Sequence, residues 1–410
     1  MKKLENFIIM KKIKKDFDII VVGSGLSALS TIYGIQLNKK KYKIALITGK
    51  PKFDIKNNHP KIFKDLMNFK NILSHKLHQG NFSLPGNIGG LVFFWGQQCN
   101  INENKDSSKK NIFKIKKFFS NFFKLKNGKK IFEKKFDNLS AVFETPDETL
   151  KQSKLFLKFK NYYKKKCNIF YNEAISINKN QIILDNGVKI YGDKIFLCTG
   201  LIGTINLVRS MNDKVDFTFN DHSPSIDLIY AKSKRNNSTS KNIYSMICKI
   251  YSKKKKIQMY SKFYPLNSLE ILFFIGRLKF YLPKLILNYK LNIKGFYFVQ
   301  KWSNSSISEY KIKGSSLKRE KTNFEKFIEL SNVYKNLNYR RLFTFTPKLL
   351  NFHFHNLKVI KNNKKYKINN YLKKINPNVY CPGMLSQEII NCLPPSFNSF
   401  VKIIDNLKKI

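Results

Sequence analysis

The chain has 410 residues, of which 42% are hydrophobic, so it is long enough for two domains and too apolar for a wholly disordered protein. Its formal net charge is +51, yet the excess is spread along the chain and is almost entirely lysine, with six arginines among 77 basic residues. Arginine is the side chain that binds bases and phosphates in a planar, bidentate way. The composition therefore favours a solvated basic surface over a specific nucleic-acid site, although such a charge attracts anions in general, including acidic lipid headgroups.

The six cysteines are widely spaced, and no pair has the C-x-x-C spacing of a zinc or redox site. We therefore expect a reduced, cytoplasmic compartment, no disulfide framework and no metal site. The N-terminus has a basic start, but its first apolar run has only four residues, which is too short for the apolar core of a signal peptide.

Three predicted elements open the chain. Residues 17–23, FDIIVVG, form a continuous apolar run typical of a buried parallel strand. A glycine-rich turn follows, then a helical pattern to about residue 38, then a second apolar run at residues 42–48. A strand, a helix and a strand within about thirty residues are what a mononucleotide-binding unit requires.

The turn between the first strand and the helix reads GSGLSA, with Gly23, Gly25 and Ala28 at the positions of a G-x-G-x-x-G/A motif. The first glycine permits a tight turn, the second lets the backbone approach a pyrophosphate, and the small third residue lets helix and strand pack closely. The helix N-terminus offers free amide donors to the phosphates. Thr48 ends the second strand, where such folds usually carry an acidic residue that binds the ribose.

The remaining elements are predicted in order. Residues 101–165 are rich in lysine and phenylalanine and partly helical, and short strands begin at residue 168. The sequence Asp185-Asn186-Gly187 predicts a hairpin turn. A buried strand and helix follow at 194–211, residues 219–345 are β-rich, and the last sixty residues return to a strand, a glycine turn and a closing helix.

Four segments in this order resemble the glucose–methanol–choline family of FAD oxidoreductases. They are FDIIVVGSGLSA, GGLVFFWGQQ, KIFLCTGLIGTINLVRSM, and the tail from FHFHN to the closing helix. The resemblance covers about 40% of the chain, all in what would be the FAD-binding part. It implies FAD as cofactor, held by Gly23, Ser24, Gly25, Leu26, Ala28, Thr48, Gly89, Gly90, Trp95, Gly96, Thr199, Gly200 and Gly383.

The same resemblance implies the catalytic residues. Members of the family move a hydride from an alcohol to the flavin while a histidine takes the hydroxyl proton. FHFHN is similar to the family's H-x-x-G-T, which gives this role to His353, with His355 as a second candidate and Asn356 in place of the glycine. An imidazole is chemically suited to the role because its pKa lies near neutrality.

A second catalytic position matches less well. The family usually has His or Asn before Pro in N-P-x-x-T, whereas this chain has Pro394 there; Asn391 or Asn398 serves in a shifted register. NDHSP, residues 220–224, resembles a D-H-P-x element of the family, and as an isolated string we interpret it as a helix cap or a turn around Asp221.

The interpretation is an α/β flavoprotein with a Rossmann-like FAD-binding domain, residues 1–215 and 346–410, and a β-rich substrate domain, residues 216–345. The expected reaction is oxidation of an alcohol, on a sugar or a lipid-linked glycan, with an unknown electron acceptor. Residues 268–287 are apolar but interrupted by basic residues and proline, so we expect a buried segment or an interfacial helix at the inner face of the membrane. The alternatives are a flavoprotein that reduces a double bond, a non-catalytic FAD-binding protein, and a nucleic-acid-binding protein predicted from charge alone.

Overall fold

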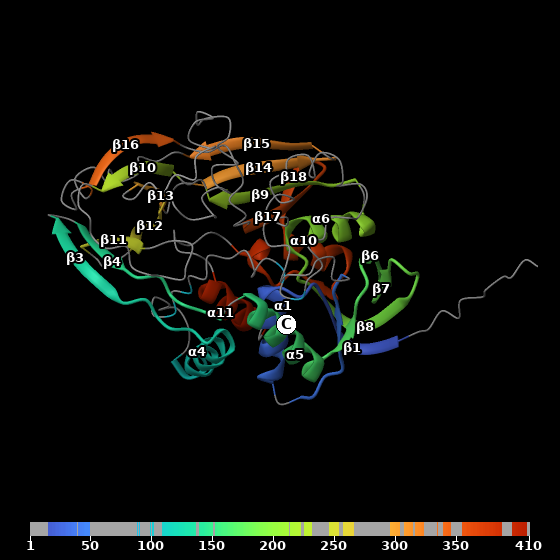
Figure 1. The fold of residues 1–410 in the computed structure, drawn as a ribbon. Helices are drawn as coiled ribbons and strands as arrows, with labels where there is room; N and C mark the ends of the chain where they lie inside the picture. The colour runs from blue at the N-terminus through green and yellow to red at the C-terminus, as the bar shows by residue number, and fades with distance from the viewer. Residues whose placement is uncertain are drawn as a thin grey trace, which may run out of the picture.

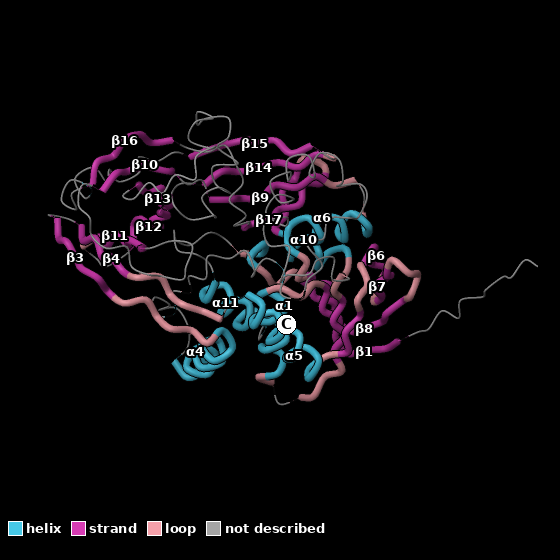
Figure 2. The backbone as a smooth tube through the Cα atoms, in the orientation of Figure 1, coloured by secondary structure: helices cyan, strands magenta, loops and turns pink. Residues whose placement is uncertain are grey.

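The computed structural model describes residues 15–38, 40–49, 88, 90, 99, 101, 109–136, 139–150, 152–212, 214–222, 225–231, 246–253, 257–265, 296–303, 307–314, 316–323, 334, 339–345, 355–387 and 396–407. Figures 1 and 2 show two parts, one with helices around a mixed sheet and one made of strands.

A sheet of seven described strands forms the centre of the first part. Its order is β5-β2-β1-β8-β7-β6, with β19 also paired to β8. The bounds are β1 Lys15–Val22, β2 Ile44–Ile47, β5 Asn168–Phe170, β6 Ala174–Asn178, β7 Gln181–Leu184, β8 Lys189–Leu197 and β19 Val379–Tyr380. Pairing is parallel among β5, β2, β1, β8 and β19, while β6, β7 and β8 form an antiparallel meander.

Helices cover both faces of this sheet, as the apolar runs predict. Along β1, Val21 packs into the core with α1 (Leu26–Gln36), α4 (Lys109–Phe123), α5 (Gln152–Lys166) and α11 (Ser396–Leu407). Its neighbour Ile20 packs on the other side, with α6 (Gly200–Met211) and α10 (Ile368–Ile375). The two ends of the chain are joined here, because α1 and α11 lie side by side and Gly34 of α1 meets Leu407 of α11.

The second part contains two antiparallel sheets. The larger has the order β16-β10-β13-β12-β11-β4-β3, and the smaller has the order β15-β14-β9-β17-β18. The bounds in the larger sheet are β3 Lys130–Phe136, β4 Leu139–Glu144, β10 Ser225–Ala231, β11 Met246–Ser252, β12 Ile257–Pro265, β13 Phe296–Ser303 and β16 Tyr339–Phe345. Those in the smaller are β9 Asp216–His222, β14 Ile307–Lys313, β15 Ser316–Asn323, β17 His355–Lys361 and β18 Lys364–Lys367.

The predicted α/β class, with a Rossmann-type part and a second β-rich part, is confirmed. The sheets also join segments across the expected boundaries at 215/216 and 345/346. β4 pairs with β11, and β9 pairs with β17. The division into two domains at these residues stays a prediction.

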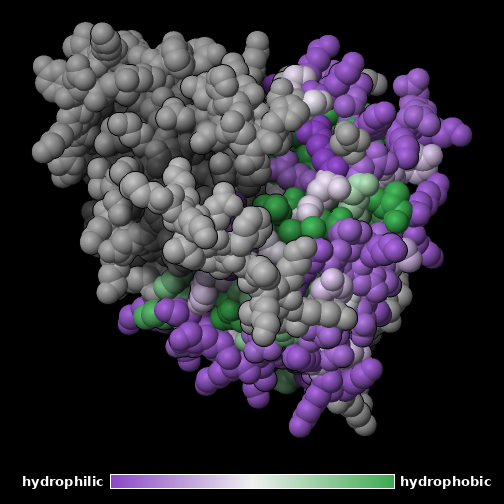
Figure 3. Space-filling model, turned by 90° about the vertical axis from the view of Figure 1, so that its right-hand side faces the viewer, coloured by the Kyte–Doolittle hydropathy of each residue, from purple (hydrophilic) through white to green (hydrophobic). Residues whose placement is uncertain are grey.

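Within the described residues, no helix is both long and apolar enough to cross a membrane. The apolar segment 268–287 lies outside the described residues. The face that carries β6–β8 is largely hydrophilic where it is described, with a narrow hydrophobic band across it (Figure 3).

Candidate active site

The turn after β1 is built around Gly23. Its φ of +100° lies in a region that L side chains rarely adopt, and a Cβ there would stand 2.3 Å from the carbonyl oxygen of Cys198. The Gly23 amide donates to the Ile47 carbonyl at 2.8 Å. Only glycine fits the turn between the ends of β2 and β8, and the role of Gly23 in binding a cofactor stays a prediction.

The N-terminus of α1 carries no acidic side chain of its own. Gly25 caps the helix without a side-chain hydrogen bond, and the first turn holds no acidic residue. The Tyr163 hydroxyl donates to the carbonyls of Ser24 and Gly25, at 3.1 and 3.3 Å. These hydrogen bonds hold the turn against α5. An anion at this helix end would meet free amides and the positive end of the helix dipole.

Three other segments with predicted cofactor residues approach the same turn. A Cβ on Gly90 would lie 3.5 Å from the Gly25 Cα, and one on Gly383 would lie 2.7 Å from the Ser27 Oγ. Thr199, which caps α6, has its amide 3.0 Å from the position of a Gly23 Cβ. The structure therefore brings together four segments that are far apart in the sequence. We call the turn from Gly23 to Ala28, with these neighbours, the cradle.

Thr48 has a structural partner inside the cradle. Its Oγ1 lies 2.8 Å from the Ser24 Oγ, and the pair is buried. This bond ties the end of β2 to the turn after β1 and occupies one hydrogen-bonding position of the Thr48 hydroxyl, where such folds usually carry an acidic residue that binds the ribose.

Two buried histidines meet where β9 ends and β17 begins. His355 opens β17 and His222 ends β9, and their rings are edge-on with centroids 5.7 Å apart. The exposed fractions are 4% and 3%. Asn356 has a φ of 51°, at the position where the resembling motif has glycine. This conformation suits glycine and asparagine, and it coincides with a register shift between β17 and β9.

Both histidines are held in the neutral form. Burial lowers the pKa of His222 to about 4. Burial, His222 and the positive charge of Lys402 together lower the pKa of His355 well below its usual value. Neither ring nitrogen of His355 has a hydrogen-bond partner within the part of the chain that the structure describes. His355 is thus a buried, neutral imidazole whose unprotonated ring nitrogen is available to accept a hydrogen bond.

One short segment connects the cradle to the histidine pair. Gly383 packs on Ser27 of the cradle, and four residues later the Gln387 carbonyl accepts a hydrogen bond from the Asn356 amide at 2.8 Å. The 3-10 helix η3 (Met384–Ser386) between them packs on β17. Residues 383–387 therefore connect the N-terminus of α1 to the backbone beside His355.

Helix α11 adds two polar groups on this side. Asn398 and Lys402 are one turn apart and share a helix face. The positive charge of Lys402 is one of the causes that lower the pKa of His355. The Asn398 Oδ1 is buried without a hydrogen-bond partner among the described residues. Asn398, predicted as the second catalytic position, thus has a buried acceptor without a partner among the described residues.

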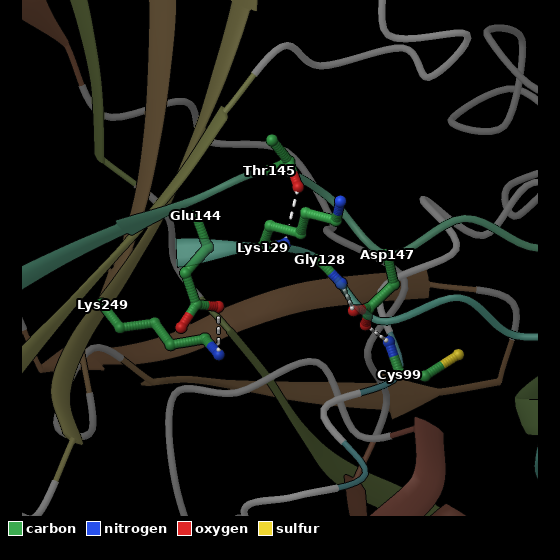
Figure 4. A network of polar contacts seen from close by, with 7 residues as sticks. All are labelled: Cys99, Gly128, Lys129, Glu144, Thr145, Asp147 and Lys249. Atoms are coloured by element: carbon green, nitrogen blue, oxygen red, sulfur yellow. Dashed lines mark hydrogen bonds and ion pairs between the residues drawn. The ribbon is translucent and has the colours of Figure 1, made fainter. Parts of the chain in front are cut away.

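Asp147 fixes the segment that follows the predicted flavin-lining stretch. Its carboxylate accepts from the amides of Cys99, at 2.9 Å, and Gly128, at 2.8 Å, and Lys249 pairs with Glu144 at 2.8 Å nearby (Figure 4). His353, Gly89, Trp95 and Gly96, four of the predicted site residues, lie outside the described residues.

Sequence reasoning missed two residues of this site. The isolated string NDHSP predicts a helix cap or a turn, whereas His222 ends β9 and contacts His355; its similarity to the D-H-P-x element is the signal that could have found it. Tyr163 lies in a lysine-rich helix and gave no signal, because only the fold brings its hydroxyl to the cradle.

No protein-family profile matches the chain, and no curated protein matches it. Among solved structures, pyridoxine 4-oxidase from Mesorbium loti has a TM-score of 0.51 at 10% identity, covering 96% of this chain and 98% of that chain. A flavin-dependent brominase has a TM-score of 0.32 at 11% identity, covering 95% of this chain and 76% of that chain. A geranylgeranyl bacteriochlorophyll reductase-like protein from Thermoplasma acidophilum has a TM-score of 0.32 at 10% identity, covering 97% and 80%. The first likeness shows a shared fold over nearly the whole length, and the other two are too low to carry an argument.

Proposed function

We propose that this protein binds FAD in the cradle and oxidises an alcohol, with His355 as the base. The observation that carries the proposal is the segment from Gly383 to Gln387, which packs on the α1 N-terminus at one end and holds Asn356, beside His355, at the other. A glycine turn at a helix N-terminus suits the pyrophosphate of a dinucleotide cofactor. A neutral imidazole that one short segment connects to this turn suits a proton-transfer step.

The residues of the cradle fit FAD. The pyrophosphate would lie on the amides of the α1 N-terminus, where Gly25 and Gly90 leave no side chain in the way. The Ser24–Thr48 pair implies that the ribose is held by some group other than a carboxylate at position 48. A bound flavin would supply the acceptor for two electrons.

His355 would perform the proton transfer. Because burial keeps it neutral, it is ready to accept the hydroxyl proton of an alcohol at one of its ring nitrogens, both of which have no other partner among the described residues. Asn398 would accept a hydrogen bond from the same substrate through its Oδ1 and so orient it. The buried surroundings exclude water from the reacting centre.

The family resemblance favours a sugar or lipid-linked glycan hydroxyl as the alcohol. One solved structure that shares the fold is called a pyridoxine 4-oxidase, and this name supports an oxidase that works on a small molecule. The basic surface would favour acidic substrates and contact with acidic lipid headgroups at the inner face of the membrane.

The first test is the absorption spectrum of the purified protein from 300 to 550 nm, before and after denaturation. We expect a flavin spectrum with one FAD per chain, and bleaching of that spectrum by an alcohol in the absence of oxygen. His355→Gln should keep the spectrum and slow the bleaching by about a hundredfold or more, because a general base contributes that much. A colourless protein that cannot be reconstituted with FAD would overturn the proposal.

The second arm tests the role of His355. If the flavin of His355→Gln is bleached by the alcohol as fast as that of the unmodified protein, His355 is not the base; if no alcohol bleaches the unmodified protein, the double-bond alternative is favoured. Lys318→Met serves as the control, because Lys318 is an exposed residue of β15 far along the chain from the histidine pair. Its bleaching rate should not change.

A further inference from the structure

Helices α4 and α5 lie together at the lower end of the view in Figure 1. Their contacts are mainly aromatic: the ring centroid of Phe122 in α4 lies 4.9 Å from that of Phe159 and 5.7 Å from that of Tyr162, both in α5. The Lys158 ammonium of α5 also donates to the Asn121 carbonyl of α4. The two helices are therefore neighbours whose outer sides form one surface.

We call the exposed side chains of residues 112–124 and 154–166 the α4–α5 surface. Helix α4 contains five lysines and α5 contains six, and neither helix contains Asp or Glu. Partial burial, together with the positive charge of Lys124 just after α4, lowers the pKa of Lys158. These two ammonium groups therefore repel each other where the helices meet. An anion that approaches from solvent would reduce the repulsion.

Two apolar side chains project from the α4–α5 surface. The exposed fractions of Phe113 in α4 and Leu157 in α5 are 70% and 54%, the two highest among the large hydrophobic side chains that the structure describes. Phe113 is one turn from Lys117, and Leu157 is two turns from Lys164, so each shares its helix face with an exposed lysine. The opposite side of α4 packs in the core, where Phe119 is fully buried. Phe113 and Leu157 thus stand in solvent among lysines.

This combination fits a bilayer that contains acidic lipids. The lysines would meet the negatively charged headgroups, and each apolar side chain would leave water for the boundary between the headgroups and the acyl chains. A lysine ammonium needs no planar partner, so it suits headgroups that present separate charges. A nucleic acid would use the same positive charge, but its charged backbone offers no apolar layer for an aliphatic side chain such as Leu157. The charge and the apolar side chains together therefore favour a lipid partner.

The end of α1 connects this surface to the cradle. The ring of Tyr33 in α1 stacks on that of Phe118 in α4 at 3.7 Å, and the Tyr162 hydroxyl of α5 donates to the Gln36 side chain at 3.0 Å. Leu37, just after α1, is also exposed. Because α1 begins in the cradle and has 11 residues, its far end lies about 16 Å from the cradle. A protein docked by the α4–α5 surface would hold the cradle about one helix length from the headgroups.

We propose that the α4–α5 surface docks this protein on a bilayer that contains acidic lipids. Its lysines bind the headgroups, and Phe113 and Leu157 enter the bilayer interface. The surface lies outside the cradle and the histidine pair, so the inference does not depend on the proposed oxidation. It gives the contact with acidic headgroups a specific place on the molecule.

The test is co-sedimentation of the purified, full-length protein with lipid vesicles at pH 7 in 0.15 M salt. One set of vesicles contains phosphatidylcholine alone, and the other contains about 30% phosphatidylglycerol. We expect binding to the acidic vesicles to be at least about tenfold tighter, because each lysine near an acidic surface adds attraction. Equal binding to both sets, or no binding to the acidic vesicles, would overturn the inference, and this comparison needs no variant.

Phe113→Ser combined with Leu157→Ser removes the two apolar side chains and keeps every charge. We expect it to weaken binding to acidic vesicles by about tenfold or more, because less apolar area leaves water. Ile175→Ser combined with Leu342→Ser is the matched control, since these side chains of β6 and β16 are 52% and 45% exposed. The control should bind as the unmodified protein does, and equal losses in the two double variants would contradict insertion by the α4–α5 surface.

Lys117→Gln combined with Lys164→Gln tests the charge of the same surface, and we expect it to weaken binding to acidic vesicles by about tenfold. Lys313→Gln combined with Lys318→Gln lowers the net charge equally, but at exposed positions of β14 and β15. Charges farther than about 8 Å from the headgroups are largely screened at this salt concentration, so this control should have little effect. Equal effects of the two pairs would mean that the protein adsorbs by its overall charge, and the docking surface would be refuted.

A nucleic-acid partner is separated from a lipid partner with a labelled DNA duplex and fluorescence anisotropy. The variant that combines Phe113→Ser and Leu157→Ser should bind DNA as the unmodified protein does, because its charge is unchanged. If it loses as much affinity for DNA as for acidic vesicles, the two side chains do not act through a bilayer, and the inference fails.

Discussion

At the residue scale, the histidine pair links acid stability to the site. The pKa of His222 is about 4 in the folded chain, below its usual value of about 6.5. Between these two pH values His222 is protonated in the unfolded chain and neutral in the folded chain. The stability that this shift contributes is present above pH 6.5 and is lost as the pH falls toward 4. Between pH 7 and pH 5 the loss attributable to His222 should be about 2 kcal/mol, and His355 adds to it in the same direction.

Urea unfolding of the unmodified protein and of His222→Gln at both pH values measures this loss. We expect the free energy of unfolding to fall less between pH 7 and pH 5 in the variant, since glutamine does not titrate. Most carboxylates titrate below this window, so their contribution is small and is common to both proteins. An equal fall in both would mean that His222 is not held neutral by burial.

At the element scale, the cradle depends on one backbone conformation. Gly23→Ala should destabilise the protein by more than the roughly 1–2 kcal/mol that a left-handed conformation costs an L residue, because its Cβ would also overlap the Cys198 carbonyl. Gly187→Ala is the matched control: its φ is +78°, and a Cβ there meets nothing within 4 Å. Urea unfolding compares the two, and an equal loss would mean that β1 and β8 separate to admit the methyl group.

The elements around the cradle were predictable because their signals are local. The apolar runs of β1, β2 and β8 and the Asn186-Gly187 hairpin follow from neighbouring residues, and the hairpin between β7 and β8 is confirmed. The pairing of β4 with β11 joins residues more than a hundred positions apart. No local pattern specifies such a contact, since many antiparallel partners would suit a short apolar strand equally well.

The same reason explains the parts of the site that the sequence did not reveal. His222 meets His355 only because β9 pairs with β17. Burial is hidden in the same way outside the site: Lys262 of β12 is one of 71 lysines, and it is buried because of its place in the larger sheet. When one residue type covers most of the surface, the sequence does not show which member of that type is buried. Only the fold distinguishes the buried residue from the exposed ones.

At the scale of the whole molecule, the charge of +51 predicts binding to polyanions without sequence preference. The described face in Figure 3 is mainly hydrophilic, in keeping with lysines spread over the surface. We expect two labelled DNA duplexes of equal length and unrelated sequence to bind with the same affinity at 0.05 M salt, as measured by fluorescence anisotropy. Raising the salt to 0.2 M should weaken both by about a hundredfold or more, because each released counterion adds to the salt dependence.

The flavin absorption is recorded during the same titration. It should not change as DNA is added, because the cradle and the histidine pair are buried while the lysines that bind DNA are solvated. A duplex preferred by tenfold or more, with binding that survives 0.5 M salt, would instead require planar contacts to bases. The chain has only six arginines for such contacts, and its composition therefore disfavours a specific nucleic-acid site. Sequence-selective, salt-resistant binding would contradict this interpretation and favour a nucleic-acid-binding function.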